Sequence, residues 1–342
     1  MSKFVRKCNV GIQHGCSPST QSKGTQVEKP SSSYHGKSDD NRDAFLTYDR
    51  LCREVLCSQD AIISWCQDIG LIAKAMPCPT CGECMAIVET NDRADHMKWE
   101  CRRQIGRKRH RCEKSIRSGS WFAQSNLSLE ETLKFTYWWC CDLKQDQIRQ
   151  QLQLGKHTAV DWDMFCRETC EVVMMQADKK KVGGEGKRVQ IDESKIGKRK
   201  YYRGHQVEGQ WVFGGIEEDS RECFIVTVEH RDEATLLPLI QEWIAPGTTI
   251  ISDCWKAYIN LPKYGYTHET VNHSKEFVNK DGSHTNKIEG HWRQMKTNLS
   301  THGRRKHHYA SYLAEFLYRY KHKDSDIFKA FIHDVVKVYN PH

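Results

Sequence analysis

The chain has 342 residues, a formal net charge of +8 and 17 histidines besides. Its length allows two or three domains, and no apolar run approaches the roughly 18–20 residues that cross a membrane. The first residues lack the apolar segment of a secretory signal, so the 16 cysteines favour reduced thiols and metal ligands over disulfides. The basic excess favours a polyanionic partner.

The first part of the chain divides into an arm and a helical segment. Residues 1–42 are rich in Ser, Gly, Lys, Gln and Asp, and this composition predicts a disordered basic arm. Residues 43–75 carry apolar side chains at helical spacing, which predicts two short helices. Ser58, followed by Ala61 and further apolar residues, is a predicted N-cap.

A Cys-x-x-Cys segment predicts a metal site. Cys78 and Cys81 stand in a tight knuckle with Pro and Gly, where two thiolates can bind one zinc ion. Cys101 and Cys112 are the predicted second pair, although the stretch between them is long for a knuckle. Alternative ligands are Cys84, His96 and His110. The other interpretation is a set of ordinary thiols without metal.

A basic run lies between the second pair of cysteines. Its cations are Arg102, Arg103, Arg107, Lys108, Arg109 and Arg111. Such a run suits contacts with DNA phosphates, because neutralising each phosphate releases counterions. A solvated loop would have the same composition.

Residues 126–177 are predicted to form three helices. Ser128 with Glu131 fits a capping box, and Gly155 separates a short helix from a longer one. This order is the outline of a helix-turn-helix, so the segment is either DNA-binding or simply helical. Residues 178–187, rich in Lys and Gly, are the predicted linker.

An α/β domain is predicted over residues 188–323. Strands are expected at 189–193, 210–217, 223–229 and 248–252, and helices at 234–244 and from 255. Helices after residues 308 and 326 are expected to cover one face of the sheet. The last of them is the predicted C-terminal helix of residues 324–342.

Three carboxylates in this domain form a candidate active site. Asp192 and Asp253 each end a predicted buried strand, and Glu289 lies beside the apolar stripe of a helix. Three such carboxylates can hold two Mg²⁺ ions, which prefer oxygen ligands and catalyse phosphoryl transfer. Because strand residues alternate between faces, Asp192 is expected to reach the ions and the neighbouring Glu193 to face away.

Other residues are expected around the three carboxylates. Asn286 lies one turn before Glu289, where it would either orient that carboxylate or cap the helix. His273 is a candidate for contact with a phosphate or a metal-bound water, or is structural. Glu193, Asn286 and His273 are thus the supporting candidates. Candidate DNA-binding residues in this domain are Lys198, Arg199, Lys200, Arg293 and Lys296.

The chain resembles the Merlin-type transposases and their bacterial insertion-sequence relatives over about residues 60–320. The resemblance rests on the words IDESKIG, SDCWKAY, VNHSKEFV and HTNKIEGHWRQMK, in which Asp192, Asp253 and Glu289 look like a DDE triad. Residues 115–122, SIRSGSWF, are similar to the word that follows an N-terminal zinc ribbon in these transposases. The resemblance therefore places a zinc ribbon at residues 76–125.

The resemblance implies an RNase H-like fold and a cut-and-paste DNA transposase. Two Mg²⁺ or Mn²⁺ ions would bind, one between Asp192 and Asp253 and one between Asp192 and Glu289, with one structural zinc elsewhere. The implied partners are transposon ends and target DNA, bound by a homo-oligomer in the nucleus of a eukaryotic host or otherwise in the cytoplasm. One alternative is a domesticated transposase that only binds DNA, and another is an RNase H-like RNA nuclease.

Overall fold

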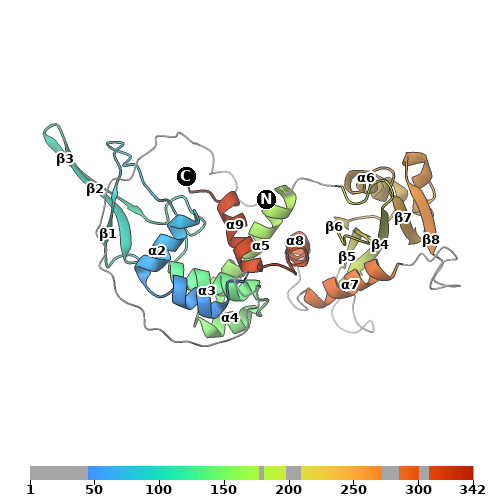
Figure 1. Cartoon of the computed structure of the whole chain (residues 1–342), viewed down its shortest axis with the longest axis horizontal. Helices are drawn as coiled ribbons and strands as arrows, with labels where there is room; N and C mark the ends of the chain where they lie inside the picture. Colours follow the sequence, from blue (N-terminus) through green and yellow to red (C-terminus); the bar gives the residue numbers. More distant parts are fainter. Residues whose placement is uncertain (1–44, 177–180, 198–208, 272–284, 300–307, 342) are drawn as a thin grey trace, which may run out of the picture. The chain divides into compact units, whose positions relative to one another are not determined.

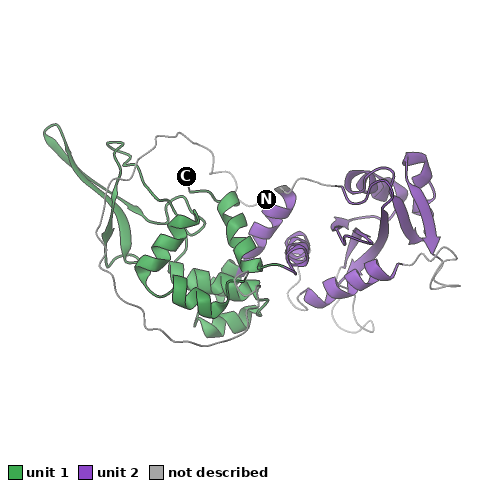
Figure 2. Ribbon diagram, in the orientation of Figure 1, with its two compact units in different colours: residues 1–162, 325–342 green, residues 163–324 purple. Residues whose placement is uncertain are grey.

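The structure is a computed structural model that describes residues 45–176, 181–197, 209–271, 285–299 and 308–341 (Figure 1). The predicted arm lies outside these residues, as do His273, Lys198, Arg199 and Lys200. The chain divides into two compact units (Figure 2). Unit 1 comprises residues 1–162 and 325–342, and unit 2 comprises residues 163–324.

Helices form much of unit 1. The first two predicted helices are α1 (Tyr48–Arg50), which continues as the π-helical turn η1 (Leu51–Val55), and α2 (Gln59–Asp68). The three that follow the sheet are α3 (Leu129–Cys140), α4 (Gln145–Gln151) and α5 (Lys156–Gln176), which runs on into unit 2. Both predicted helix starts are confirmed: the Ser58 hydroxyl accepts the Ala61 N–H at 3.1 Å, and Ser128 forms a capping box with Glu131.

The last helix, α9 (Ile327–Val338), also belongs to unit 1. The prediction that it covers the α/β sheet is wrong. The ring of Phe331 lies 5.2 Å from Trp139 and 6.0 Å from Trp121, and Phe328 lies 5.2 Å from Tyr137. The aromatic stripe of α9 thus packs on the aromatic-rich α3, and its closeness in sequence to the α/β domain does not decide which core it joins.

An antiparallel sheet completes unit 1, in the order β1 (Ala86–Glu89), β2 (Met97–Ile105) and β3 (Lys108–Ser115). The sheet is joined to α3 through Arg117, which forms a buried ion pair with Asp95. Asp95 also accepts the N–H of Leu129, the first residue of α3, at 2.8 Å. The arginine of the SIRSGSWF word therefore has a structural role, because removing it would leave a buried carboxylate without its cation.

Unit 2 contains a five-stranded mixed sheet. Its strands are β4 (Arg188–Ile196), β5 (Gln210–Glu217), β6 (Cys223–Val228), β7 (Thr249–Asp253) and β8 (Thr267–Val271). Their order is β6-β5-β4-β7-β8, with β4, β5 and β6 antiparallel and with β7 and β8 parallel to β4. The predicted α/β class is confirmed for this unit.

The strand β8 is missing from the sequence prediction. A helix is expected from residue 255, but only two short 3₁₀ turns form, η3 (Lys256–Tyr258) and η4 (Leu261–Tyr264). Pro262 lies in the first turn of η4, and Gly265 ends this turn with a left-handed φ of 86°. These two residues stop a longer helix and turn the chain into β8, whose short polar sequence gives little alternation to recognise.

Helices cover both faces of this sheet. Helix α6 (Glu233–Trp243) packs on one face, where Val189 and Ile191 of β4 join its Leu236. Helices α7 (Asn286–Asn298) and α8 (Tyr309–Lys321) pack on the other. The predicted apolar stripe of α7 is confirmed, and its buried members are Ile288, Trp292, Met295 and Leu299.

Residues 181–187, predicted as linker, are part of unit 2 and pack against the rest of it. The N–H of Val182 donates to the Trp243 carbonyl at 2.8 Å, and Val182 forms a parallel bridge with Ile244. Gly183 has a φ of +87°, and a Cβ there would lie 2.5 Å from the Thr248 hydroxyl. The glycine therefore allows a close approach to the sheet rather than a flexible hinge.

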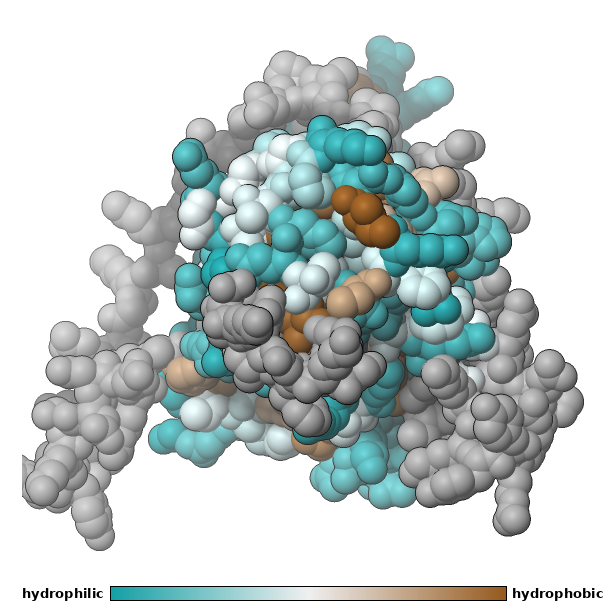
Figure 3. All heavy atoms as spheres, turned by 90° about the vertical axis from the view of Figure 1, so that its right-hand side faces the viewer, coloured by the Kyte–Doolittle hydropathy of each residue, from teal (hydrophilic) through white to brown (hydrophobic). Residues whose placement is uncertain are grey.

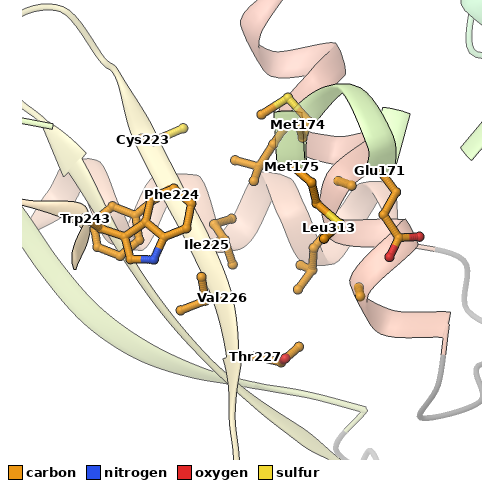
Figure 4. Close-up of a pocket in the computed structure, with 13 residues that line it drawn as sticks. Glu171, Met174, Met175, Cys223, Phe224, Ile225, Val226, Thr227, Trp243 and Leu313 are labelled. Carbon is orange, nitrogen blue, oxygen red and sulfur yellow. The ribbon is translucent and has the colours of Figure 1, made fainter. Parts of the chain in front are cut away.

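A cavity of about 360 Å³ lies between the end of α5, the edge strand β6 and α8 (Figure 4). Met174, Phe224 and Leu313 are among its mainly apolar lining residues. None of the predicted site residues lines it, so it is separate from the candidate active site. Within the described ranges, no helix has the length and apolar character to span a membrane, and the face in Figure 3 is mainly hydrophilic.

Candidate active site and metal cluster

Asp192 lies on the face of β4 that is covered by α7. The indole Nε1 of Trp292 donates to Asp192 Oδ2 at 3.0 Å, which fixes one carboxylate oxygen. Burial raises the pKa of Asp192 to about 6, and the negative charges of Asp253 and Glu289 add to this shift. Asp192 therefore lies close enough to Asp253 and to Glu289 to be affected by the charge of each.

Asp253 is brought beside Asp192 by strand register. The parallel pairing of β4 with β7 runs to Gln190 opposite Ile251, and both carboxylates stand two residues further along their strands. The carboxyl ends of parallel strands meet at one edge of a sheet, so both side chains reach that edge. The backbone N–H of Trp255 donates to Asp253 Oδ1 at 3.0 Å and holds this carboxylate.

Glu289 comes from the first turn of α7, and a buried glutamine sets the position of that helix. Thr285 makes no side-chain cap; its hydroxyl instead donates to Glu289 Oε1 at 3.2 Å. The side chain of the fully buried Gln190 accepts the N–H groups of Lys287 and Ile288 at 3.0 and 3.1 Å. The β4 strand that carries Asp192 thus also caps the helix that carries Glu289.

Glu193 points to the opposite face from Asp192, as the alternation predicts. It accepts a short hydrogen bond from the hydroxyl of Tyr258. Burial raises the pKa of Glu193 to about 7, with a further contribution from the charges of Asp192 and Asp253, while Arg231 opposes the rise. Glu193 therefore lies on the opposite side of the sheet from Asp192, and its supporting role stays a prediction.

The other predicted site residues are scattered. Asn286 is the first residue of α7 and not its cap, and it lines a separate cavity with Gly290 and Gln294. Arg293 and Lys296 are exposed on α7, one and two turns beyond Glu289. All six predicted basic-run residues lie in the hairpin of β2 and β3.

Sequence reasoning missed four groups at this site. Gln190 and Trp292 hold α7 and Asp192, and Tyr258 binds Glu193. The guanidinium carbon of Arg231 lies 3.8 Å from the ring centroid of Trp211, beside the site. A polar Gln190 in a buried strand was the one available signal, because such a side chain needs a hydrogen-bond partner.

The metal cluster of unit 1 contains three cysteines and a histidine. Across the part of the chain that the structure describes, one set of three or more His, Cys, Asp or Glu ligand atoms lies within 4.8 Å: Cys78, Cys81, Cys101 and His110. The three carboxylates of unit 2 are not grouped as tightly as this. The Cys101 Sγ lies 3.7 Å from Cys81 Sγ and 3.3 Å from His110 Nε2.

The close set contains His110, one of the predicted alternative ligands, and does not contain Cys112. Cys112 pairs with Cys101 across β2 and β3, so it lies on the same face but outside the close set. His110 is diagonal to Cys101 on that face, and its longer side chain brings Nε2 to 3.5 Å from Cys78 Sγ. Three thiols and an imidazole at these distances fit a tetrahedral zinc ion.

Comparison with known proteins gives a family match that lies within unit 2. Residues 175–321 match the ISXO2-like transposase domain family. An uncharacterized transposase-like protein of Haemophilus influenzae is 29% identical over 102 residues, which are 30% of this chain and 82% of that protein.

Solved structures give a more distant similarity. Crystal structures of the mariner Mos1 paired end complex with Mg and of a pre-cleavage Mos1 transpososome are 12% and 11% identical, with TM-scores of 0.26 and 0.25. Each match covers 58% of this chain and 73% of the Mos1 chain. These values are too low to bear on fold or function.

Proposed function

We propose, from the premise that residues 175–321 form an insertion-sequence transposase domain of the ISXO2-like family, that the chain is a metal-dependent cut-and-paste DNA transposase. The observation that carries this proposal is the approach of Asp192, Asp253 and Glu289 at one edge of the sheet. Their mutual repulsion, which helps to raise the pKa of Asp192 to about 6, is the electrostatic setting that divalent cations relieve.

Each residue of the site has a distinct task in this proposal. Asp192 would bind both Mg²⁺ or Mn²⁺ ions, and Asp253 and Glu289 would each bind one. Ions held there supply the charge that activates the attacking oxygen and stabilises the leaving oxygen of a DNA phosphodiester. Trp292 keeps Asp192 in one orientation, while Gln190 keeps the Glu289 helix docked on β4.

The remaining parts of the chain would recognise DNA. Unit 1, with zinc at its cysteine cluster and helices α3 to α5, would bind the transposon ends, and two or more copies would hold both ends together. Water would cleave the end, and the freed 3′-hydroxyl would join target DNA. The expected location is the nucleus in a eukaryotic host and the cytoplasm otherwise.

The test uses the full-length protein and a supercoiled plasmid that carries the element with its flanking DNA. We expect nicked and then excised product with Mg²⁺ or Mn²⁺, and none when both ions are omitted. Specific binding of the ends without any nicking in either metal would contradict the proposal. That result would favour a domesticated protein that only binds DNA.

Metal analysis tests the cysteine cluster separately. Purified protein is expected to carry about one zinc per chain. His110→Ala should lower this occupancy severalfold, because it removes one of four ligands, whereas Cys112→Ser should leave it unchanged. Loss of zinc in Cys112→Ser with retention in His110→Ala would show that the ligand set follows the sequence prediction instead.

A further inference from the structure

The outer part of the β2–β3 hairpin is a free two-stranded ribbon. Strand β1 pairs with β2 only from Met97 to Glu100, whereas β2 and β3 continue to pair with each other to Ile105 and Lys108. The hairpin extends outward beyond β1 within unit 1 (Figure 1). We call residues 101–112 the distal ribbon.

Strand register divides the side chains of the distal ribbon between two faces. Residues directly opposite each other share a face, and the face alternates along each strand. The metal face carries Cys101, Arg103, Ile105, Lys108, His110 and Cys112. The arginine face carries Arg102, Gln104, Arg109 and Arg111. The basic run is therefore not one uniform patch.

The metal face is partly occupied by the rest of unit 1. Cys101 and His110 turn toward the knuckle of Cys78 and Cys81. Beside them, the Arg103 guanidinium lies 3.3 Å from the carboxylate of Glu83. The arginine face is turned away from this knuckle, and its four residues are all exposed, so an outside partner can reach it.

Two guanidinium groups of the arginine face, those of Arg102 and Arg111, are held by a buried carboxylate. The side chain of Glu100 is only 6% exposed and accepts the Nε groups of Arg102 and Arg111, both at 2.8 Å. The side chains of Arg102 and Arg111 are themselves 66% and 56% exposed. Binding through Nε orients each side chain, and Arg111 is held further by its Nη2, which lies 2.7 Å from Glu113 Oε1. Such fixed guanidiniums recognise paired acceptors with a smaller entropy loss than mobile ones.

We infer that the arginine face enters the major groove of duplex DNA and reads base edges there. A two-stranded ribbon fits this groove, which is about 12 Å wide. Arginine pairs with the two acceptors of guanine and glutamine with adenine, so Arg102, Arg109, Arg111 and Gln104 are the readers. The choice of duplex DNA rests on the proposed function, whereas the division of roles between the two faces rests on the register.

The same register gives phosphate contacts to the remaining cations. Arg103 and Lys108 lie on the metal face, and Arg107 lies in the turn between the strands. At the groove walls these side chains would meet the backbone and add affinity without sequence preference. The sequence predicts phosphate contacts for all six cations of the basic run. The inference keeps that role for three of them, Arg103, Arg107 and Lys108.

Two charge-matched double variants of the full-length protein test the inference. Arg102→Ala with Arg109→Ala removes two cations from the arginine face, and Arg103→Ala with Lys108→Ala removes two from the metal face. Each protein is used to select sequences from a randomised duplex DNA pool, and its affinities for selected and unselected duplexes are compared. Zinc content and circular dichroism of both variants control for folding.

The two variants are expected to differ in sequence specificity but to change the salt dependence of DNA binding by the same amount. The arginine-face variant should lower the ratio of selected to unselected affinity by about tenfold or more. The metal-face variant should leave that ratio near the wild-type value, although both should reduce the salt slope by up to about two. Replacing guanine by 7-deazaguanine in the selected duplex, which removes a major-groove acceptor, should weaken the wild type more than the arginine-face variant.

Equal specificity ratios in the two variants, or no effect of 7-deazaguanine, would overturn the inference. Plasmid nicking in Mg²⁺ separates this failure from failure of the proposed function. If the wild-type protein nicks DNA but enriches no sequence, the proposed nuclease function stands and the inference that the ribbon reads bases fails. If enrichment depends on the arginine face but no nicking occurs, the inference about the ribbon stands and the proposed nuclease function fails.

Discussion

Replacing any one of Asp192, Asp253 and Glu289 by alanine is expected to reduce DNA strand cleavage by about a thousandfold or more. A bound cation contributes several kcal/mol to the stabilisation of a phosphoryl-transfer transition state, and each replacement removes a proposed ligand of that cation. DNA binding should remain within a few-fold of wild type, because the proposed readers lie in unit 1. Single-turnover nicking of plasmid DNA and a separate binding titration measure the two quantities.

Two further variants make this experiment specific. Asp219→Asn removes an exposed carboxylate from the turn between β5 and β6, and it should leave the cleavage rate unchanged. Glu193→Gln keeps the hydrogen bond from Tyr258 behind the sheet, so its loss of rate should be much smaller than that of Asp192→Ala. If Glu193→Gln is as inactive as Asp192→Ala, Glu193 binds the cations directly. The assignment of cation binding to Asp192 and not to Glu193, which lies on the opposite face, is then wrong. A triad variant that cleaves at the wild-type rate removes that residue from the mechanism.

Unit 2 is expected to become less stable as pH rises from 5 to 8 in the absence of divalent cations. The pKa values of Asp192 and Glu193 are raised to about 6 and about 7, from ordinary values of 3.8 and 4.5 that the unfolded chain regains. The folded protein therefore holds these protons more tightly than the unfolded chain. The stability that they contribute is complete below about pH 4 and is lost as pH passes through 6 and 7. At about 1.4 kcal/mol per pKa unit, reduced for partial exposure, the loss is roughly 2–5 kcal/mol.

Thermal unfolding at a series of pH values measures this loss, which corresponds to roughly 5–10 °C in Tm. The buffers contain no chelator, so that the cysteine cluster is left undisturbed. Mg²⁺ should restore much of the stability at pH 8, because the cations replace the lost protons between the carboxylates. Glu193→Gln should raise the Tm at pH 8 but not at pH 4, while Asp219→Asn should change neither. A flat Tm from pH 5 to 8 in the wild type would contradict the assigned electrostatics.

Much of the fold could be predicted from local patterns in the sequence. The capping residues Ser58 and Ser128 and the stripe of α7 depend on neighbours within one helix, and such neighbours are visible in the sequence. The alternation of β4 likewise separates Asp192 from Glu193 without knowledge of the partner strands. The sequence predicts Asp192, Asp253 and Glu289 as one candidate site from two strand ends and a helix face, and the resemblance adds that they look like a DDE triad. Spacing alone does not order the strands of a sheet, so it does not by itself place Asp253 beside Asp192.

The features that sequence reasoning missed depend on contacts between distant segments. His110 joins the close set and Cys112 does not, because an imidazole reaches diagonally across two paired strands, and ligand spacing along the chain does not contain that geometry. Gln190 caps a helix that begins almost a hundred residues later. The placement of α9 reflects a match between aromatic surfaces, which no periodic pattern specifies.

The return of the chain to unit 1 has a consequence for dissecting this protein. Unit 2 is an insertion within unit 1, since residues 325–342 complete the core that residues 1–162 begin. A fragment that stops after α5 would lack Phe331 and would expose the rings of Trp139 and Trp121. Dividing the chain into two fragments would therefore give an amino-terminal fragment with exposed aromatic rings, which favours aggregation, rather than an autonomous DNA-binding module. Excising residues 181–321 and bridging the gap with a short glycine-rich loop is the design that keeps α9 covalently beside its partner helix.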